Sequence, residues 1–321
     1  MANSGGITDW LVLHSKALAL EVNHFTWTKD WLPRYTDVSI SLRWKGKTFI
    51  GRSLALSEEE SLVTAGAEAL ERLAQAQNEI PTSNGMAAHF SRDAAYEGGL
   101  RELVERDRFL CHFLTGTPFL PFDEKILNED LRAVIARLAK LGVRLEMREM
   151  RRLNEFFSIA CAAFGESFER PFGMVAGFGC DQDLKSAAQR AFLECIRHVL
   201  PLIEEGDAPL TLDEFSRVPY PGPEEHYRLA LDLDVAREQT KLFLPEAGSS
   251  VLQIENFPLR TEVKELPMEL PGDLPGFLVV QVSCKDLQPF YFGVPKEDNI
   301  NREALRRFSK NPIKLQPHFL S

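Results

Sequence analysis

Residues 83–109 read SNGMAAHFSRDAAYEGGLRELVERDRF, and this stretch contains a turn followed by a long helix. Gly85 lies among small turn residues, and Ser91 is a favoured N-cap for the helix that follows it. Glu102 and Glu105 stand three positions apart, so a helix places their carboxylates on one face. The stretch therefore predicts a helix that presents two acids together, directly followed by an arginine.

The same arrangement occurs three times along the chain. When the copies are aligned on one glutamate each, an N-cap residue stands eleven positions earlier and a small residue stands three positions earlier. The glutamates are Glu68, Glu102 and Glu194, the N-caps are Ser57, Ser91 and Asp183, and the small residues are Ala65, Gly99 and Ala191. A small residue one turn before the glutamate lets another backbone or a ligand approach closely. The chain is therefore predicted to contain internally repeated strand–turn–helix units.

The turn after each glutamate distinguishes the three copies. The first two copies continue with Glu71-Arg72 and Glu105-Arg106, whereas the third continues with Arg197-His198. Two acids on one helix face destabilise the helix unless something neutralises them. The arginines can do so in part, and a bound Mg²⁺ would do so better, because it binds carboxylates together with substrate phosphates. A solvated helix face is the alternative interpretation, and spacing alone does not decide between the two.

The remaining segments predict an α+β fold of mixed β-sheets packed with helices. The pattern of apolar residues and turns predicts a hairpin over 35–49, strands over 143–147, 155–164, 171–178 and 276–283, and helices over 57–77, 91–113, 128–141, 183–200, 224–241 and 301–308. Pro201 is expected to end or kink the helix that begins at Asp183. The chain contains no Walker P-loop sequence and no Rossmann fingerprint. We expect one domain over residues 1–321, with a core of about 35–310 and an irregular tail over 311–321.

Composition narrows the functional classes. The 321 residues carry a formal net charge of -10, which argues against a general nucleic-acid binder. The longest apolar runs are too short to span a membrane, and the start does not resemble a signal peptide. The five cysteines include no C-x-x-C pair, which predicts reduced, mostly buried thiols rather than disulfides or a zinc site. A cytoplasmic protein is expected.

Four segments together resemble the YcaO family. Residues 83–109 are similar to the turn of small residues and the E-x-x-E-R-D helix of that family. Residues 51–74, GRSLALSEEESLVTAGAEALERLA, and residues 177–198, GFGCDQDLKSAAQRAFLECIRH, resemble its flanking helices. Residues 279–308, VVQVSCKDLQPFYFGVPKEDNINREALRRF, are similar to the late strand, the L-Q-P-x-x-F-G turn and the following helix of azoline-forming members. The resemblance covers roughly residues 35–310 and implies a YcaO-like fold.

This resemblance also implies cofactors, site residues and a reaction. The cofactors are ATP and Mg²⁺, the metal ligands would be Glu68, Glu71, Glu102 and Glu105, and the residues facing ATP and its phosphates would be Arg190, Glu194 and Arg197. The reaction would activate a peptide amide: a nucleophile adds to the carbonyl, the oxyanion takes the γ-phosphate of ATP, and phosphate then leaves. The resemblance assigns no catalytic residue of the protein. An azoline is the expected product, while a thioamide or an amidine stays open.

The expected partners follow from the same resemblance. They are a ribosomally made precursor peptide and a separate leader-recognition protein or an E1-like or TfuA-like protein, with a homodimer as an open alternative. The third helix departs from the family pattern, because Val199 stands where an arginine is common and the arginine is instead Arg197. This departure favours an alternative function, in which the chain is a non-catalytic scaffold or substrate-binding subunit. A third reading is an enzyme that acts on a larger protein.

Overall fold

The computed structural model describes residues 5–244 and 254–319. Contacts between residues divide the chain into two compact units. Unit 1 comprises Met1–Leu103 and Thr261–Cys284, and unit 2 comprises Val104–Arg260 and Lys285–Ser321. Helix α3 (Arg92–Thr115) contains residues of both units. The predicted α+β class with several small sheets is confirmed, while the single domain over residues 1–321 stays a prediction.

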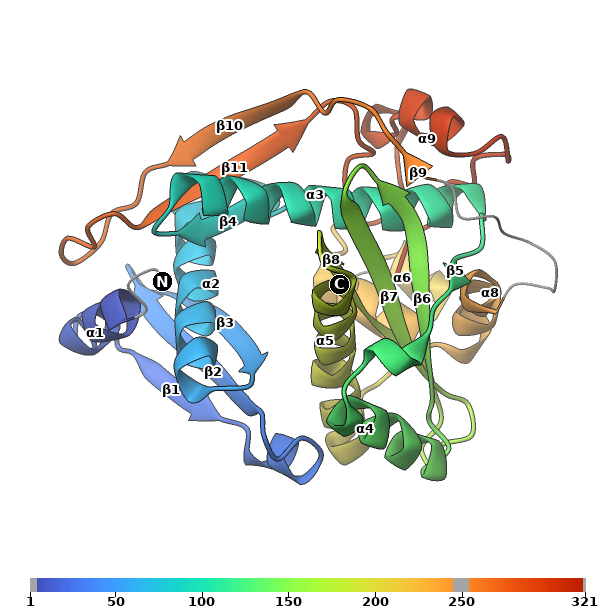
Figure 1. The fold of residues 1–321 in the computed structure, drawn as a ribbon, viewed down its shortest axis with the longest axis horizontal. Coiled ribbons are helices and arrows are strands. Elements are labelled where there is room, and N and C mark those ends of the chain that lie inside the picture. The colour runs from blue at the N-terminus through green and yellow to red at the C-terminus, as the bar shows by residue number, and fades with distance from the viewer. Residues whose placement is uncertain (1–4, 245–253, 320–321) are drawn as a thin grey trace. The chain divides into compact units, whose positions relative to one another are not determined.

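Unit 1 contains two three-stranded antiparallel sheets and the helices that cover them (Figure 1). The first sheet has the order β1 (Glu21–His24), β2 (Thr36–Trp44) and β3 (Lys47–Ala55), and the second has the order β10 (Thr261–Leu266), β11 (Leu278–Cys284) and β4 (Met86–His89). The helical elements are α1 (Gly5–Leu13), the 3-10 helix η1 (Thr26–Asp30) and α2 (Glu58–Gln77). Helix α2 buries Ala65, Ala69 and Leu73 in one cluster with Val38 and Ile40 of β2. Glu68 and Glu71 of α2 are not part of this apolar cluster and are half-buried.

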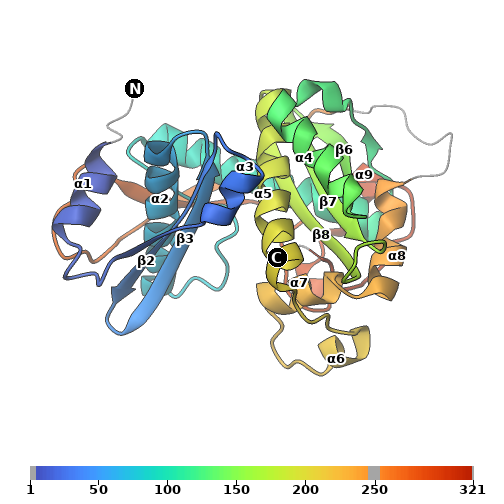
Figure 2. The ribbon, with the colours of Figure 1, turned by 90° about the horizontal axis from the view of Figure 1, so that it is seen from below.

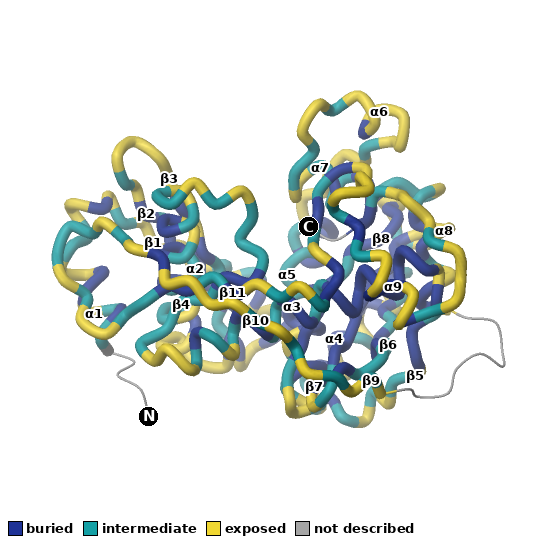
Figure 3. Tube along the Cα trace, turned by 90° about the horizontal axis from the view of Figure 1, so that it is seen from above, coloured by how far each residue is buried: buried dark blue, intermediate teal, exposed yellow. Residues whose placement is uncertain are grey.

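Unit 2 is built around a mixed sheet with the order β5 (Leu120–Pro121), β6 (Arg144–Leu153), β7 (Phe156–Gly165) and β8 (Phe172–Asp181), to which β9 (Ile254–Glu255) adds in parallel beside β6. Helix α5 (Leu184–Glu205) runs along the sheet at β8, as Figure 2 shows. The other helical elements are η2 (Glu124–Ile126), α4 (Glu129–Lys140), α6 (Leu212–Ser216), α7 (Pro223–Ala230), α8 (Leu233–Phe243), η3 (Glu297–Asn299) and α9 (Arg302–Phe308). Figure 3 shows buried backbone along β6 and β8 and exposed backbone around α6.

Local signals in the sequence predicted several helix starts and turns correctly. Ser57 and Asp183 accept hydrogen bonds from the backbone N–H groups of Glu60 and Ser186, so both predicted N-caps are confirmed. The 35–49 hairpin is confirmed as β2 and β3, with Gly46 at φ +82° in its turn. These features depend on neighbouring residues only, which is why the sequence contains them.

Three helical predictions need correction. The helix predicted over 224–241 is two helices, α7 and α8, because the side chain of Asp232 accepts the N–H groups of Asp234 and Val235 and so caps a new helix. Helix α5 does not end at Pro201 but continues to Glu205, and the alternative of a kink at Pro201 stays a prediction. The composition predicts a surface connection over 205–225, but helix α6 lies within this segment.

The prediction that most of the cysteines are buried is confirmed. None of the five, all of which lie in the described ranges, forms a disulfide, and four are buried. Within residues 5–244 and 254–319, none of the helices combines the length and the apolar character that crossing a lipid bilayer requires.

Candidate functional site

Each of the three copies of the repeat contains one hydrogen bond that joins its helix to the chain segment packed against that helix. In every copy, the Oε2 atom of the aligned glutamate accepts a hydrogen bond from a backbone N–H of the preceding strand or turn. The three bonds are Arg52 N to Glu68 at 2.8 Å, Gly85 N to Glu102 at 3.2 Å and Phe178 N to Glu194 at 2.5 Å. A hydrogen bond to one carboxylate oxygen also fixes the direction of the second oxygen. Each copy of the repeat therefore positions its glutamate in the same way.

The small residues of the repeats explain how the segments come this close. A Cβ atom added to Gly51 would stand 2.0 Å from the carbonyl oxygen of Ala65, and one added to Gly99 would stand 2.4 Å from that of Gly85. In the third copy of the repeat, a Cβ on Gly177 would lie 2.2 Å from a backbone nitrogen of α5. The predicted close approach is therefore an approach of the helix backbone to a strand or turn backbone. This contact brings each backbone N–H within reach of its glutamate.

The acids of unit 1 influence one another. Arg72 pairs with Oε1 of Glu68 at 2.7 Å, which confirms the predicted partial neutralisation. Burial, followed by the negative charges of Glu102 and Glu68, raises the pKa of Glu71 well above its ordinary value. Glu68, Glu71 and Glu102 are thus brought into one electrostatic cluster. Carboxylates that raise the pKa of a neighbour favour a bound cation, and oxygen donors of this kind suit Mg²⁺.

The predicted metal set is not a preformed coordination sphere. No group of three or more His, Cys, Asp or Glu side chains in the described ranges is arranged to hold a metal ion. Two of the acids are instead engaged by backbone N–H groups. The chemistry of the donors fits magnesium, and their assignment as ligands stays a prediction.

Glu105 belongs to unit 2 and stands one turn after Glu102 in α3. Its carboxylate lies 3.9 Å from the Nε atom of Arg106, and 14% of its side chain is exposed. The guanidinium of Arg106 lies over the ring of Phe290, 5.4 Å from its centroid. The arginine that follows the acid pair is therefore fixed between a carboxylate and an aromatic ring.

The third repeat supplies the predicted cations. Arg190 is 58% exposed at its side chain, and its Nε lies 3.5 Å from Asp181. Arg197 is partly buried on α5, two turns after Arg190. Both residues and Glu194 come from the same helix of unit 2. Their contact with a nucleotide stays a prediction.

Sequence reasoning missed a buried ion-pair network next to the E-x-x-E-R motif. Asp107 and Arg108 are both fully buried and hydrogen-bonded to each other, and Arg108 Nη1 also lies 3.2 Å from Glu255. Burial opposes the charge of Arg108, yet the two carboxylates hold its pKa above the ordinary value. The only sequence signal is that the motif continues as E-R-D-R, because burial of a charge depends on segments far away in the chain.

A second missed feature is an aromatic and acidic setting around Arg52. Its guanidinium donates to both carboxylate oxygens of Asp37, at 2.9 and 2.7 Å, and lies 4.1 Å from the ring centroid of Phe25. Because the backbone N–H of Arg52 binds Glu68, the same residue joins this cluster to the acidic helix.

His226 is a fully buried histidine of unit 2. Its Nε2 accepts the N–H of Gly293 at 2.7 Å, so Nδ1 carries the proton and donates to the carbonyl of His318 at 2.5 Å. Burial is the largest cause that lowers the pKa of His226. Both ring nitrogens are thereby engaged by backbone.

Comparison with known proteins connects these features to a family. A family model described as a YcaO cyclodehydratase that binds ATP and Mg²⁺ matches residues 76–266, which is more than half of the chain. The search of curated proteins returned no match. The matched range includes the second and third repeated helices.

Solved structures share the fold at low sequence identity. A YcaO protein from Methanopyrus kandleri, bound with AMPPCP and Mg²⁺, is 18% identical, with a TM-score of 0.56 over 89% of this chain and 91% of that chain. A heterocyclase in complex with substrate and cofactor is 13% identical, with a TM-score of 0.65 over 96% of this chain and 56% of that chain. A chain of the E. coli microcin synthetase McbBCD complex is 12% identical, with a TM-score of 0.53 over 78% of this chain and 85% of that chain. At these identities the likeness establishes the fold alone.

The family match covers the second and third repeated helices, and the fold agrees with it over most of the chain. The chain therefore belongs to the YcaO family, whose model describes ATP- and Mg²⁺-binding cyclodehydratases.

Proposed function

We propose that this chain uses ATP and Mg²⁺ to modify backbone amides of a ribosomally made precursor peptide, and that the modification is azoline-forming cyclodehydration. Membership of the YcaO family over residues 76–266 carries the proposal. The heterocyclase and the microcin synthetase among the structures of the same fold are consistent with it. A cyclodehydratase closes a Cys, Ser or Thr side chain onto the preceding carbonyl and releases one water overall.

The metal-binding role is proposed for Glu68, Glu71, Glu102 and Glu105. The cluster of the first three supports it: burial raises the pKa of Glu71 most, the charges of Glu102 and Glu68 raise it further, and a divalent cation would offset both effects. The backbone bonds to Glu68 and Glu102 orient both carboxylates before a metal arrives. A preorganised acid loses little conformational freedom on binding.

Contact with the nucleotide is proposed for Arg190, Glu194 and Arg197. Positioned cations stabilise the charge that develops on a transferring phosphoryl group. The N–H of Phe178 binds Glu194 in the same manner as backbone N–H groups bind Glu68 and Glu102. This supports a shared origin of the three copies of the repeat. The arginine at 197 in place of a second acid suits a phosphate better than a metal.

The chemistry requires a phosphoryl donor more than it requires a protein nucleophile. Amide oxygen is a poor leaving group, and ATP would supply the phosphoryl group that turns it into phosphate. The chain's own residues then have to hold the nucleotide, orient the peptide carbonyl and exclude water. The proposed partners are the precursor peptide and a separate protein that recognises its leader; a homodimer and a cytoplasmic location belong to the same proposal.

Mass spectrometry of a precursor peptide tests the proposal. We expect the wild-type chain, with ATP, Mg²⁺ and a peptide encoded beside its gene, to produce a species lighter by one water. An exchange of sulfur for oxygen would identify a thioamide instead. The Glu102→Gln variant keeps an oxygen that can accept the Gly85 N–H but loses the charge, so it should give unmodified peptide. An unchanged peptide with wild type and its recognition partner would overturn the proposal.

A further inference from the structure

Helix α9 and the segment that follows it border a small pocket in unit 2, called here the α9 pocket. Its volume is about 370 Å³, which is within the range of ligand-binding pockets. Three of the described residues that line it are cations, Arg302, Arg306 and Lys310, and none of them is acidic. The residues proposed to bind metal or nucleotide do not line it. The α9 pocket is therefore a separate site with positively charged walls.

Positive charge is concentrated in this part of the sequence. Residues 300–319 contain five basic side chains and one acidic side chain, Glu303, which gives a formal charge of +4. The whole chain, by contrast, carries a formal net charge of -10. A positive concavity on an acidic protein attracts anions to that one place.

Two of the three cations have no counter-ion in the described part of the chain. Arg302 donates two hydrogen bonds to Glu297, at 3.0 and 2.5 Å. The side chains of Arg306 and Lys310 are exposed and make no ion pair or hydrogen bond with residues 5–244 or 254–319. Arg307, the neighbour of Arg306, is instead engaged by the carbonyl of Asp286 at 2.7 Å. Arg306 and Lys310 are thus available to a ligand.

The wall formed by residues 309–314 is fastened to the end of α3. The side chain of Asn311 donates to the carbonyl of Thr115 at 3.2 Å, and the N–H of Lys314 donates to the carbonyl of Leu114 at 2.7 Å. Ile313, which lines the pocket, packs against the apolar core of unit 2. A wall that is already ordered loses little conformational freedom when a ligand binds.

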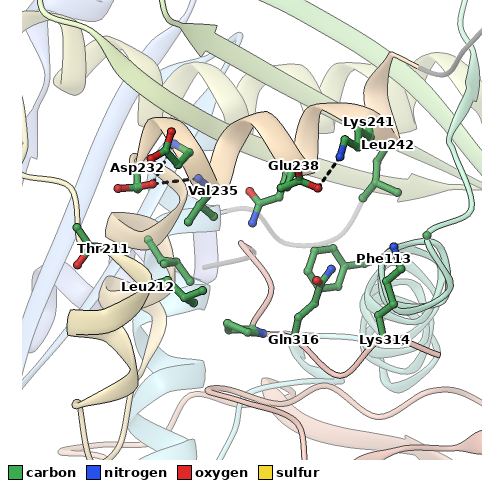
Figure 4. A pocket seen from close by; sticks show the side chains of 15 residues that line it. Phe113, Thr211, Leu212, Asp232, Val235, Glu238, Lys241, Leu242, Lys314 and Gln316 are labelled. Carbon is green, nitrogen blue, oxygen red and sulfur yellow. Dashed lines mark hydrogen bonds and ion pairs between the residues drawn. The ribbon is translucent and has the colours of Figure 1, made fainter. Parts of the chain in front are cut away.

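A second hollow of unit 2, between α8 and residues 314–317, differs in its charges (Figure 4). Glu238 pairs there with Lys241 at 2.6 Å, and Asp232 accepts the N–H groups that begin α8. Asp234 pairs with Arg237 at 2.7 Å. Most charges of that hollow are offset within the chain, whereas the α9 pocket retains positive charge for a ligand.

The number and spacing of the cations favour phosphate over carboxylate. Arg302 and Arg306 stand one turn apart on α9, so their Cβ atoms are about 5–6 Å apart. A phosphate group carries about 1.5–2 negative charges and three acceptor oxygens, and an arginine fork can bind two of these oxygens at once. A carboxylate has one charge and two oxygens. A chain of phosphates can therefore engage all three cations, and a single carboxylate cannot.

We infer that the α9 pocket binds a ligand with a chain of two or three phosphates. Arg306 and Lys310 pair with the phosphates, and Arg302 joins them in the orientation that Glu297 gives it. The ligand is either a nucleotide or an inorganic oligophosphate, which share this chemistry. The inference goes beyond the proposed function and does not depend on it.

Calorimetry with inorganic triphosphate tests the inference. The ligand is titrated into the full chain with EDTA in place of Mg²⁺, at about 150 mM salt, so that attraction between distant surface charges is screened. We expect wild type to bind and Arg306→Gln/Lys310→Gln to bind at least about tenfold more weakly. Arg306→Lys keeps the charge but loses the fork, so its affinity should lie between the two.

The matched control is Arg132→Gln/Lys140→Gln. It removes the same two charges from α4, where both residues are exposed and do not line the α9 pocket. Its affinity for triphosphate should equal that of wild type. A second control, Arg190→Gln/Arg197→Gln, removes the cations proposed for the nucleotide and should also bind triphosphate like wild type. Circular dichroism first shows that each variant is folded.

Further titrations identify the source of the phosphates. ADP and ATP, again without Mg²⁺, are compared with triphosphate on wild type and on Arg306→Gln/Lys310→Gln. Nucleotide binding that the substitutions weaken assigns the pocket to a nucleotide. Binding of triphosphate alone assigns it to an inorganic oligophosphate.

Three results would overturn the inference: no triphosphate binding by folded wild type, equal weakening by the α9-pocket variant and either control, or equally tight binding of the acidic peptide Gly-Glu-Glu-Glu-Glu-Glu-Gly. The last result would make the pocket a site for acidic peptides. Magnesium-dependent ATP binding is measured separately, so the proposed function can fail while the α9 pocket stands, and the reverse.

Discussion

The Oδ1 atom of Asp107 accepts a 2.6 Å hydrogen bond from the backbone N–H of Gln288, which joins the E-R-D-R helix to the L-Q-P turn. These are the two segments whose sequences most resemble the YcaO family, and they stand 181 positions apart. Gln288 in turn accepts the N–H of Asn301, whose side chain caps α9. The two motifs therefore form one buried structure within unit 2.

The Asp107–Arg108 pair should be sensitive to loss of its negative charge. Asp107→Asn keeps the shape of the side chain but leaves the buried guanidinium of Arg108 with a weaker partner, so we expect a loss of about 3–5 kcal/mol in the free energy of unfolding. Urea unfolding monitored by circular dichroism measures it. The control is Asp213→Asn, because Asp213 and Arg217 form an ion pair with both side chains more than 70% exposed. Equal effects of the two substitutions would contradict a structural role for the buried pair.

Gly177 should tolerate no side chain. In Gly177→Ala the new Cβ would meet backbone atoms of α5, so the helix must move away from β8 at a cost of about 1–3 kcal/mol. The displacement also lengthens the bond between Phe178 N–H and Glu194. Thermal unfolding compares Gly177→Ala with the control Gly222→Ala, in which the nearest neighbour of the new Cβ would lie at 3.6 Å. A melting temperature no lower than that of Gly222→Ala would refute the close contact.

Stability should fall in mild acid because of His112. Its Nδ1–H donates to the carbonyl of Thr117 and its Nε2 accepts the N–H of Arg151, so the folded ring must be neutral. Burial lowers the pKa of His112 to about 3, whereas the unfolded ring takes a proton near about 6.5.

Between these values the unfolded state binds the extra proton, so stability falls as the pH falls, by about 1.4 kcal/mol per pH unit for this group. Urea unfolding at several pH values, on wild type and on His112→Gln, measures the slope. The glutamine keeps one donor and one acceptor but does not titrate. An identical slope in both proteins would show that His112 is not responsible.

Glu71 should oppose folding when magnesium is absent. Its folded pKa is raised, so its contribution to stability is present at low pH and is lost as the pH rises through that pKa. Glu71→Gln should therefore raise the melting temperature at neutral pH without metal. Added Mg²⁺ should stabilise wild type and leave the variant unaffected. Scanning fluorimetry with and without magnesium decides this, and stabilisation of both proteins to the same extent would exclude Glu71 as a ligand.

The sequence contained the parts of the fold that are set locally. Ser57 and Asp183 predict the starts of helices because an N-cap contact spans only three residues. The small residues of the repeats indicate where two backbone segments lie close together. The break at Asp232 was missed because the apolar period continues through it, while its side chain captures the next N–H groups.

The parts that depend on distant segments were not predictable. The burial of Asp107 and Arg108 depends on Glu255 and on the turn at Gln288, and nothing near position 107 reveals either. The acids were recognised as a set, but their bonds to Arg52 and Gly85 backbone were not, because register between a strand and a helix follows from packing.

Isothermal titration calorimetry with ATP, in the presence and absence of Mg²⁺, tests the central claim most directly. We predict magnesium-dependent binding to wild type and a loss of at least about tenfold in affinity for Glu102→Gln, which must first be shown to unfold like wild type. Absence of ATP binding by the folded wild-type chain would contradict the proposed enzyme and would leave a non-catalytic YcaO-family subunit as the function.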